Sequence, residues 1–217
     1  MFHHRDFFRS LRGAPRVQPG TPERRRSVRH ATVFQIAKLT VGDREELCIL
    51  RDVSPNGLRA EVYFPLAVGE DVTVELRTGH SVTGRVAWSR EQAIGVEFRR
   101  PIPMQAMLAH CSFDERVGKI RPPRIVDDLP GVLRIDQVDH PIRVKNISQA
   151  GMRILIDRPL RVEMQCAVEV EAFGRRPVSV RWFRDGEGGL LLSQPMTFAE
   201  FALWRRALAR AREMAAA

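Results

Sequence analysis

From residue 31 onward, most of the chain consists of short runs in which apolar and polar residues alternate. Aliphatic and β-branched residues dominate these runs and turn-forming residues separate them, which is typical of antiparallel strands rather than helices. The first half predicts six strands, at 31–40, 45–53, 57–63, 71–77, 81–88 and 93–98. Six short strands spaced by about a dozen residues indicate an antiparallel barrel or sandwich.

The turn between the second and third predicted strands is rich in turn formers, with the sequence Asp52-Val53-Ser54-Pro55-Asn56-Gly57. Asp and Ser side chains can bond nearby backbone N–H groups, and glycine can adopt the positive φ that a tight reversal needs. Taken alone, this segment predicts a β-hairpin turn and nothing functional.

The same pattern recurs at a constant offset of 94 residues. The hairpin sequence returns without a gap as Asn146-Ile147-Ser148-Gln149-Ala150-Gly151. Three further anchors keep the offset: Trp88 with Trp182, Gly95 with Gly189, and Pro101 with Pro195. Because repeated anchors at one period indicate a duplicated unit, the second half predicts a second barrel.

Each predicted barrel is followed by a predicted helix. Residues 104–111 follow Pro101 and Pro103 and can form a short closing helix. At the C-terminus, Thr197 and Glu200 have capping-box spacing, and one helical face carries Phe201, Trp204 and Leu208. Four arginines flank that face, and their ordinary interpretation is a solvated basic surface: Arg205, Arg206, Arg210 and Arg212. The predicted fold is mainly β, with two tandem six-stranded antiparallel β-barrels, each followed by a helix.

Composition supports two compact domains and argues against general disorder, since 44% of the 217 residues are hydrophobic. No run approaches the roughly eighteen apolar residues of a membrane span, and the N-terminus lacks the apolar core of a signal peptide. We therefore expect a cytoplasmic protein. Three widely spaced cysteines without CxxC pairing indicate neither a disulfide framework nor a zinc knuckle: Cys48, Cys111 and Cys166.

Positive charge is concentrated at the N-terminus. The net charge is +9, and the first 30 residues hold eight arginines against two acidic residues. We expect a flexible basic arm at 1–22, a first domain at 23–112 and a second domain with the C-terminal helix at 113–217. The arm is interpreted as a disordered tail; the alternatives are a partner-docking or membrane-surface helix near residues 5–12.

Catalytic patterns are missing from the sequence, which has no nucleophile elbow, phosphate-binding glycine loop or metal-ligand cluster. We expect a binding protein that is not an enzyme and uses no cofactor. Arginine forks pair with phosphates and with the O6/N7 edge of guanine, while carboxylates and hydroxyls accept from guanine N1 and N2. Arg25, Arg29, Asp52 and Ser54 therefore suit a guanine nucleotide with several phosphates. The alternative is a solvated charge run beside a turn-capping aspartate.

Three motifs together resemble the PilZ family, whose members bind the bacterial second messenger cyclic di-GMP. Arg25-Arg26-Ser27-Val28-Arg29 is similar to its RxxxR motif, the hairpin at Asp52 to its Asp/Asn-x-Ser-x-x-Gly motif, and Ala93–Phe98 to its glycine-containing strand. The resemblance covers residues 23 to about 112. It implies a six-stranded barrel with a C-terminal helix.

The resemblance also implies a ligand site. Arg25 and Arg29 would hold phosphates and guanine. An arginine directly before the RxxxR motif, here Arg24, is typical of members that bind an intercalated ligand dimer. Asp52, Ser54 and Gly57 would line the guanine pocket, beside the strand that carries Gly95.

The second copy departs from the family pattern where the arginines should be. Lys119 and Pro123 occupy the positions equivalent to Arg25 and Arg29. The second half therefore resembles a degenerate PilZ-like barrel, which we expect to serve packing or contact with a protein partner.

These observations predict a bacterial cyclic di-GMP receptor that signals through a ligand-ordered N-terminal linker and an unidentified protein partner. The alternatives are an RNA- or DNA-binding β-barrel protein that uses the arginine-rich arm, and a structural adaptor without a ligand. Aromatic residues make up only 7% of the chain, which argues against a nucleic-acid-stacking surface.

Overall fold

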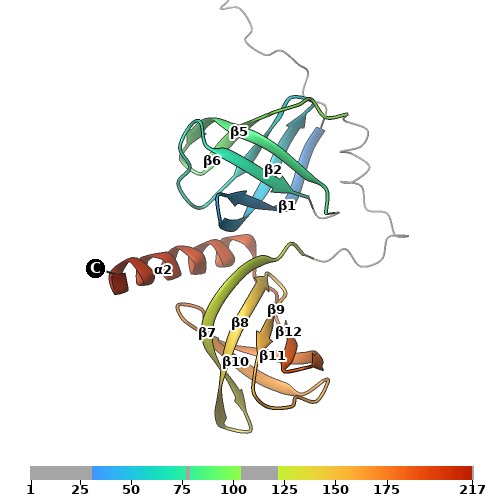
Figure 1. Ribbon diagram of the computed structural model, residues 1–217, viewed down its shortest axis with the longest axis vertical. Helices are drawn as coiled ribbons and strands as arrows, with labels where there is room; N and C mark the ends of the chain where they lie inside the picture. The colour runs from blue at the N-terminus through green and yellow to red at the C-terminus, as the bar shows by residue number, and fades with distance from the viewer. Residues whose placement is uncertain (1–30, 77–78, 104–121, 217) are drawn as a thin grey trace, which may run out of the picture.

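Two closed six-stranded antiparallel barrels and one helix make up the computed structural model, which describes residues 31–76, 79–103 and 122–216 (Figure 1). In the first barrel the strand order is β1-β2-β3-β6-β5-β4, and pairing of β1 with β4 closes the ring. Its strands are β1 (Ala31–Val41), β2 (Arg44–Ser54), β3 (Gly57–Glu61), β4 (Asp71–Glu75), β5 (Ser81–Arg90) and β6 (Ala93–Phe98). The predicted strands and barrel closure are confirmed. The arm at 1–22 and the predicted helix at 104–111 lie outside the described residues.

The second barrel repeats this topology in the order β10-β11-β12-β9-β8-β7, closed by β7 and β10. Its strands are β7 (Ile125–Ile135), β8 (Val138–Ser148), β9 (Gly151–Leu155), β10 (Gln165–Val170), β11 (Gly174–Arg184) and β12 (Glu187–Leu192). The chain ends in helix α2 (Phe198–Ala216). The tandem barrels and the C-terminal helix agree with the predicted fold class.

The duplication extends to irregularities in the strands. In the first barrel the pairing register shifts at Thr32/Gln35, Leu50/Asp52 and Val86/Trp88. The second barrel shifts at Val126/Leu129, Val144/Asn146 and Val180/Trp182, each 94 residues later. Bulges redirect the strand and its side chains, so the same offsets give the two barrels the same local shape.

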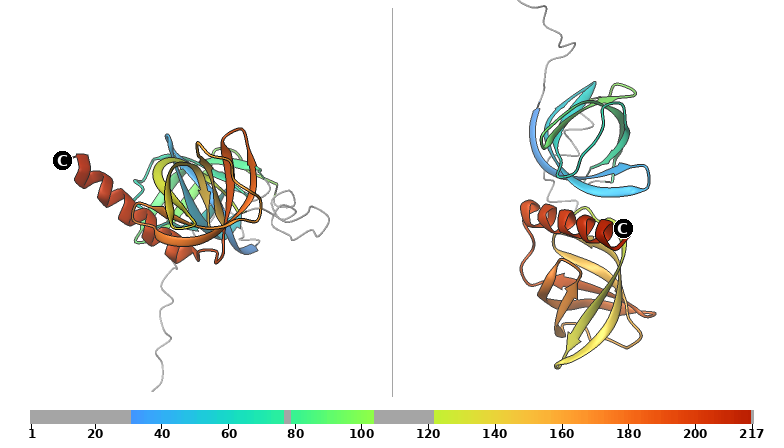
Figure 2. Two further views of the ribbon diagram at one scale, coloured as in Figure 1. Left: turned by 90° about the horizontal axis from the view of Figure 1, so that it is seen from below. Right: turned by 90° about the vertical axis from the view of Figure 1, so that its left-hand side faces the viewer.

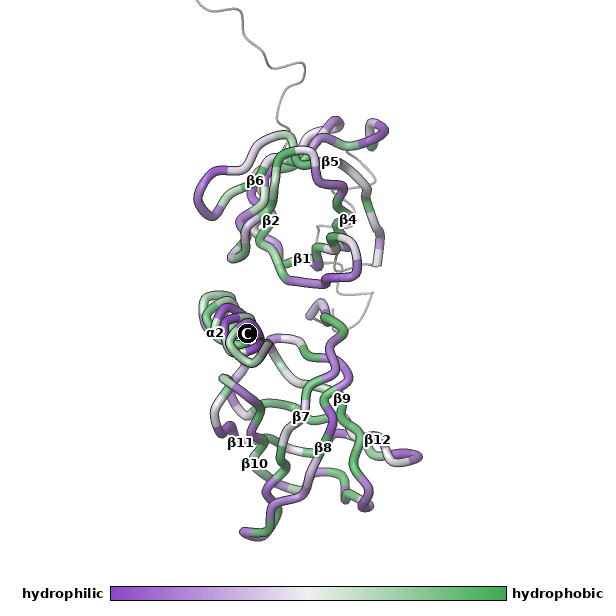
Figure 3. The backbone as a smooth tube through the Cα atoms, turned by 60° about the vertical axis from the view of Figure 1, so that its left-hand side comes forward, coloured by the Kyte–Doolittle hydropathy of each residue, from purple (hydrophilic) through white to green (hydrophobic). Residues whose placement is uncertain are grey.

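Hydrophobic and hydrophilic residues alternate along the strands of both barrels (Figure 3). The aliphatic side chains at alternate positions are buried and fill the interior of each barrel. Along β5, for example, Val82 and Val86 are buried while their neighbours face outward. Among the described residues, no helix combines the length and apolarity that a membrane crossing requires.

Helix α2 lies between the two barrels, and its C-terminal end projects beyond them (Figures 1 and 2). The predicted capping box is present: the Glu200 N–H donates to Thr197 Oγ1 at 3.2 Å, and the Thr197 N–H donates to Glu200 Oε2 at 2.8 Å. These bonds satisfy backbone donors in the first turn and fix where the helix begins.

Aromatic side chains attach α2 to both barrels. The Tyr63 ring of the first barrel meets Phe198 and Phe201 edge to face, with centroids 5.7 and 6.4 Å apart. On the second barrel, Phe173 contacts Trp204 at 5.1 Å, and the Trp204 indole N–H donates to the Glu171 carbonyl at 3.0 Å. The predicted apolar face of the helix therefore joins two cores rather than covering one.

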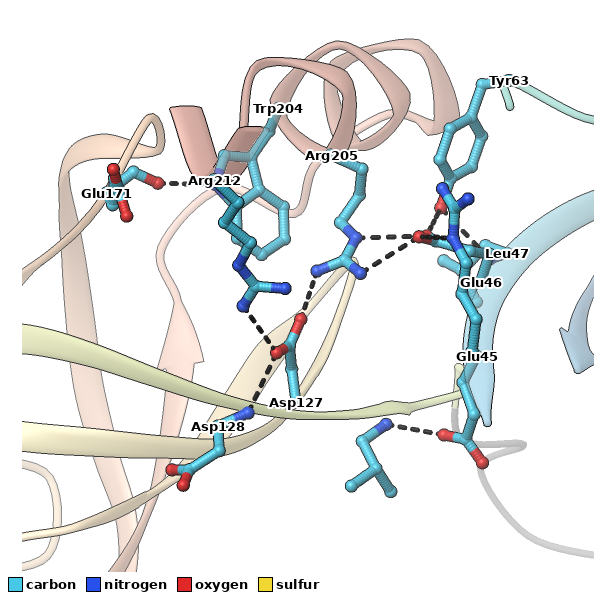
Figure 4. A network of polar contacts seen from close by, with 12 residues as sticks. Glu45, Glu46, Leu47, Tyr63, Asp127, Asp128, Glu171, Trp204, Arg205 and Arg212 are labelled. Atoms are coloured by element: carbon cyan, nitrogen blue, oxygen red, sulfur yellow. Dashed lines mark hydrogen bonds and ion pairs between the residues drawn. The ribbon is translucent and has the colours of Figure 1, made fainter. Parts of the chain in front are cut away.

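Arg205 connects the same three parts through charge (Figure 4). Its guanidinium donates to both Glu46 oxygens of the first barrel at 3.1 Å and to Asp127 Oδ2 of the second at 2.5 Å. Tyr63 O–H also donates to Glu46. Arg205 is only 9% exposed, so the interpretation of these arginines as a solvated basic surface is wrong for this residue. Helical periodicity places Arg205 beside the apolar face of α2, and the contact with Glu46 of the first barrel buries it.

Two other arginines of α2 support the joint. Arg206 Nε donates to the Tyr63 carbonyl at 2.9 Å, and Arg212 Nη2 donates to Asp127 Oδ1 at 3.0 Å. Burial opposes ionisation of Asp127, but the bonds from Arg205 and Arg212 outweigh it and hold the pKa of this carboxyl below its ordinary value. Its ionised form therefore stabilises the fold above the ordinary aspartate pKa, and this stability is lost as the pH falls through the lowered pKa.

Replacing Arg205 with methionine should lower the free energy of unfolding by about 3 kcal/mol or more, because Glu46 and Asp127 would lose a shared buried cation. Urea unfolding at pH 7 measures the loss. Arg181→Met is the matched control, since Arg181 pairs with Glu163 on the exposed surface and should cost at most about 1 kcal/mol. Equal losses for the two variants would contradict a stabilising role for the buried network.

Candidate functional site

A surface cavity of about 500 Å³ opens on the first barrel, where the β2–β3 hairpin meets β5 and β6. Its lining includes all four candidate residues that the structure describes: Asp52, Ser54, Gly57 and Gly95. The cavity is also lined by Asn56, Leu58, Arg59, Ala87, Trp88, Val96, Glu97, Phe98 and Pro101. The candidates Arg24, Arg25 and Arg29 lie outside the described residues.

Ser54 and Gly57 are built into the hairpin itself. Ser54 Oγ donates to the Gly57 carbonyl at 3.0 Å. A Cβ atom on Gly57 would lie 2.3 Å from the Val96 carbonyl oxygen, so only glycine allows β3 and β6 to approach this closely. In the second barrel, Ser148 Oγ donates to the Gly151 carbonyl at 3.1 Å. The serine and glycine of the motif thus have a structural role in both barrels.

Gly95 provides space for an aromatic ring. A Cβ atom there would lie 2.0 Å from Trp88 Nε1, so the indole rests against the backbone of β6. Gly189 and Trp182 repeat this packing in the second barrel. Trp88 is half-buried and lines the cavity, where an indole face can stack on a planar base.

The polar lining combines acceptors and one strong donor. The Asp52 side chain is 17% exposed, and its Oδ2 lies 3.9 Å from Nη1 of Arg59. Glu97 adds a second carboxylate. Such a lining can accept from the N–H groups of a heterocycle, but two carboxylates against one guanidinium do not by themselves favour a ligand with two phosphates.

The equivalent polar groups of the second barrel are held by their own neighbours. Arg124 Nη1 donates to Asn146 Oδ1 at 2.7 Å, and Asn146 occupies the position of Asp52. Arg153, equivalent to Arg59, donates to both oxygens of Glu187, with Nε 3.0 Å from Oε2. A ligand at this face would have to displace both interactions.

Sequence reasoning missed Trp88 and Arg59 as lining residues. Trp88 was recognised only as an anchor of the repeat. Arg59 follows Gly57 by two positions, so strand alternation places both on the same face, a signal that could have identified it.

The two cysteines in the described part of the chain, Cys48 and Cys166, favour the neutral thiol form. Burial raises the pKa of the Cys48 thiol to about 12 and also raises the pKa of Cys166. Across 31–76, 79–103 and 122–216, no group of three or more His, Cys, Asp or Glu side chains is arranged to hold a metal ion.

Comparisons with solved structures return several similar chains. The chain resembles the Borreliella burgdorferi PlzA protein in complex with c-di-GMP, at 10% identity over 81% of this chain and 88% of that one, with a TM-score of 0.39. It also resembles Escherichia coli YcgR in complex with c-di-GMP, at 15% identity, 83% and 85% coverage and a TM-score of 0.33. A third match is the Bacillus subtilis inhibitor of motility MotI/DgrA, at 14% identity, 83% and 98% coverage and a TM-score of 0.32.

No curated protein sequence gives a significant match. The family comparison is specific to the first half of the chain, because the model of the PilZ domain matches residues 23–114. This segment contains the predicted arginine motif, all six strands of the first barrel and the cavity. Residues 23–114 of the chain are therefore a PilZ domain.

Proposed function

We propose that this protein is a non-enzymatic receptor for cyclic di-GMP, which binds at the cavity of the first barrel. The observation that carries this function is the convergence of Asp52, Ser54, Gly57 and Gly95 on one cavity inside a PilZ domain. The sequence motifs predict these residues as part of a ligand site, and all four line the same cavity.

The described lining suits the base of this ligand. Asp52 can accept from guanine N1–H and N2–H, and Trp88 offers an aromatic face for stacking. Two carboxylates in the lining leave the phosphates to another group of cations, for which we propose Arg24, Arg25 and Arg29.

Chain connectivity supports this assignment of the arginines. Strand β1 begins at Ala31, paired with Val53, and Thr32 is paired with Asp52. The chain before β1 therefore starts beside the cavity. Arg29 is two positions earlier, and two residues span at most about 7 Å.

Calorimetric titration with cyclic di-GMP tests the function, with GTP and an oligonucleotide as control ligands. We expect cyclic di-GMP alone to bind tightly. Arg25→Ala or Arg29→Ala should weaken binding by roughly 2 kcal/mol, because each truncation removes a charged hydrogen-bond donor from a phosphate or base. The melting temperature should stay within a few degrees of that of the wild-type protein. Tight binding of the oligonucleotide without cyclic di-GMP binding would instead support a nucleic-acid-binding protein.

Asp52→Ala should weaken cyclic di-GMP binding by about 1.5 kcal/mol or more, because the guanine N–H groups would lose a charged acceptor. The second barrel supplies a matched control. Asn146→Ala alters the equivalent hairpin position and should leave affinity unchanged, although both variants can lose about 1 kcal/mol of stability at the turn. Titration and urea unfolding of both variants separate the two effects. Equal affinities for the two would exclude Asp52 from the ligand site.

We further propose that the ligand acts as a signal by ordering residues 13–30. Two phosphates would neutralise part of the arginine charge and connect this segment to the Asp52–Gly57 hairpin. This ordering would either present the N-terminal arm to a protein partner in the cytoplasm or hide the arm from it. Hydrogen exchange with saturating cyclic di-GMP should show slower exchange in 13–30 as well as in the hairpin. Protection confined to the hairpin would leave the binding site intact and exclude the switch.

A further inference from the structure

One arginine position has different neighbours in the two barrels. Arg59 on β3 and Arg153 on β9 are equivalent, since they are separated by the repeat offset of 94 residues. Arg153 is held by Glu187 on the neighbouring strand through both carboxylate oxygens. The first barrel has Ala93 at the position of Glu187, so that position supplies no carboxylate to Arg59.

Arg59 consequently keeps its donors available to the cavity. Its side chain is 45% exposed, and its contact with Asp52 is 3.9 Å, which is too long for a hydrogen bond. Within the described part of the chain, no shorter polar contact holds this guanidinium. A planar fork of five N–H donors thus lies in the cavity lining beside a carboxylate.

This pairing of donor and acceptor matches two adjacent edges of guanine. The Watson–Crick edge presents the N1–H and N2–H donors, and the neighbouring Hoogsteen edge presents the O6 and N7 acceptors. We propose that Asp52 and Arg59 together read these two edges, with Asp52 accepting from N1 and N2 and Arg59 donating to O6 and N7. Adenine reverses the pattern, because its N6 amino group would face Arg59 and its unprotonated N1 would face Asp52. Arg59 is therefore a specificity-determining residue, an inference that rests on the proposed function.

A purely structural role predicts different behaviour. If Arg59 only balanced the charge of Asp52 at the surface, its removal would change stability slightly and would change the affinity for any dianionic cyclic dinucleotide equally. Discrimination between bases therefore separates the two roles.

The experiment compares cyclic di-GMP with cyclic di-AMP by calorimetry on the full chain. Arg59→Met should weaken cyclic di-GMP binding about tenfold, as loss of a bidentate arginine–guanine contact does. Binding of cyclic di-AMP should not weaken, so the ratio of the two affinities falls. Cyclic di-inosine monophosphate, which keeps O6 and N7 but lacks the N2 amino group, should lose affinity by the same factor as cyclic di-GMP.

A second variant tests the same inference with Arg59 in place. Ala93→Glu reproduces the carboxylate that holds Arg153, so it should engage Arg59 and weaken cyclic di-GMP binding to a similar degree, whereas Ala93→Gln should weaken it less. The Arg59→Met/Ala93→Glu double variant should bind no more weakly than Arg59→Met, because both changes remove the same contact. Arg153→Met and Glu187→Ala are the matched controls in the second barrel and should leave binding unchanged.

Unchanged affinity in Arg59→Met, or equal losses for cyclic di-GMP and cyclic di-AMP, would overturn the base-reading role while leaving the receptor function in place. A wild-type protein that binds no cyclic di-GMP would overturn the receptor function and the role of Arg59 with it.

Discussion

The arrangement of the whole molecule depends on one buried arginine. Arg205 extends from α2 and shares its charge between Glu46 of the first barrel and Asp127 of the second. A guanidinium removed from water is tolerated only when carboxylates and hydrogen bonds surround it, which requires all three elements to be in place together. The network therefore specifies one position of the helix between the barrels, and the apolar packing of Tyr63 and Trp204 adds stability to that position. Strand β2 carries Glu46 near one end and Asp52 near the other, so the joint and the cavity lie on one strand.

Duplication shows which parts of the motif serve the fold. Serine and glycine of the hairpin make the same contacts in both barrels, where Ser54 and Ser148 each donate to a carbonyl three residues later. Their recurrence therefore follows from the geometry of a tight turn against a neighbouring strand. The acidic position differs, because it is aspartate in the PilZ domain and asparagine in the second barrel. A carboxylate attracts N–H donors more strongly than an amide oxygen does, so the difference between the barrels lies in the group that would read a ligand.

Much of this fold can be predicted from sequence because its signals are local. Strand alternation, the hairpin glycines and the capping box at Thr197 each act within a few residues, and the offset of 94 extends them to the second barrel. Burial of Arg205 could not be predicted, since it depends on Glu46, which is 159 residues away. The sequence around Arg59 also does not show that its guanidinium lacks, among the described residues, a hydrogen-bonded carboxylate like the one that holds Arg153. That difference comes from Ala93 on another strand, where the second barrel has Glu187. Arg24, Arg25 and Arg29 remain predictions from motif and connectivity alone.

A binding site is preorganised when its polar groups are held in place without strong internal bonds that a ligand would first have to break. In the second barrel the groups around Asn146 are satisfied internally, by Arg124 and by the Arg153–Glu187 pair, so a ligand would have to break bonds before forming its own. In the first barrel, the Asp52 carboxylate and the Arg59 guanidinium lie 3.9 Å apart, a looser contact than the hydrogen-bonded Arg153–Glu187 pair. Under the proposed function, a ligand at the first barrel would therefore break fewer bonds of Arg59 than a ligand at the second barrel would break of Arg153. Two barrels can share a motif and still differ in the residues that surround it.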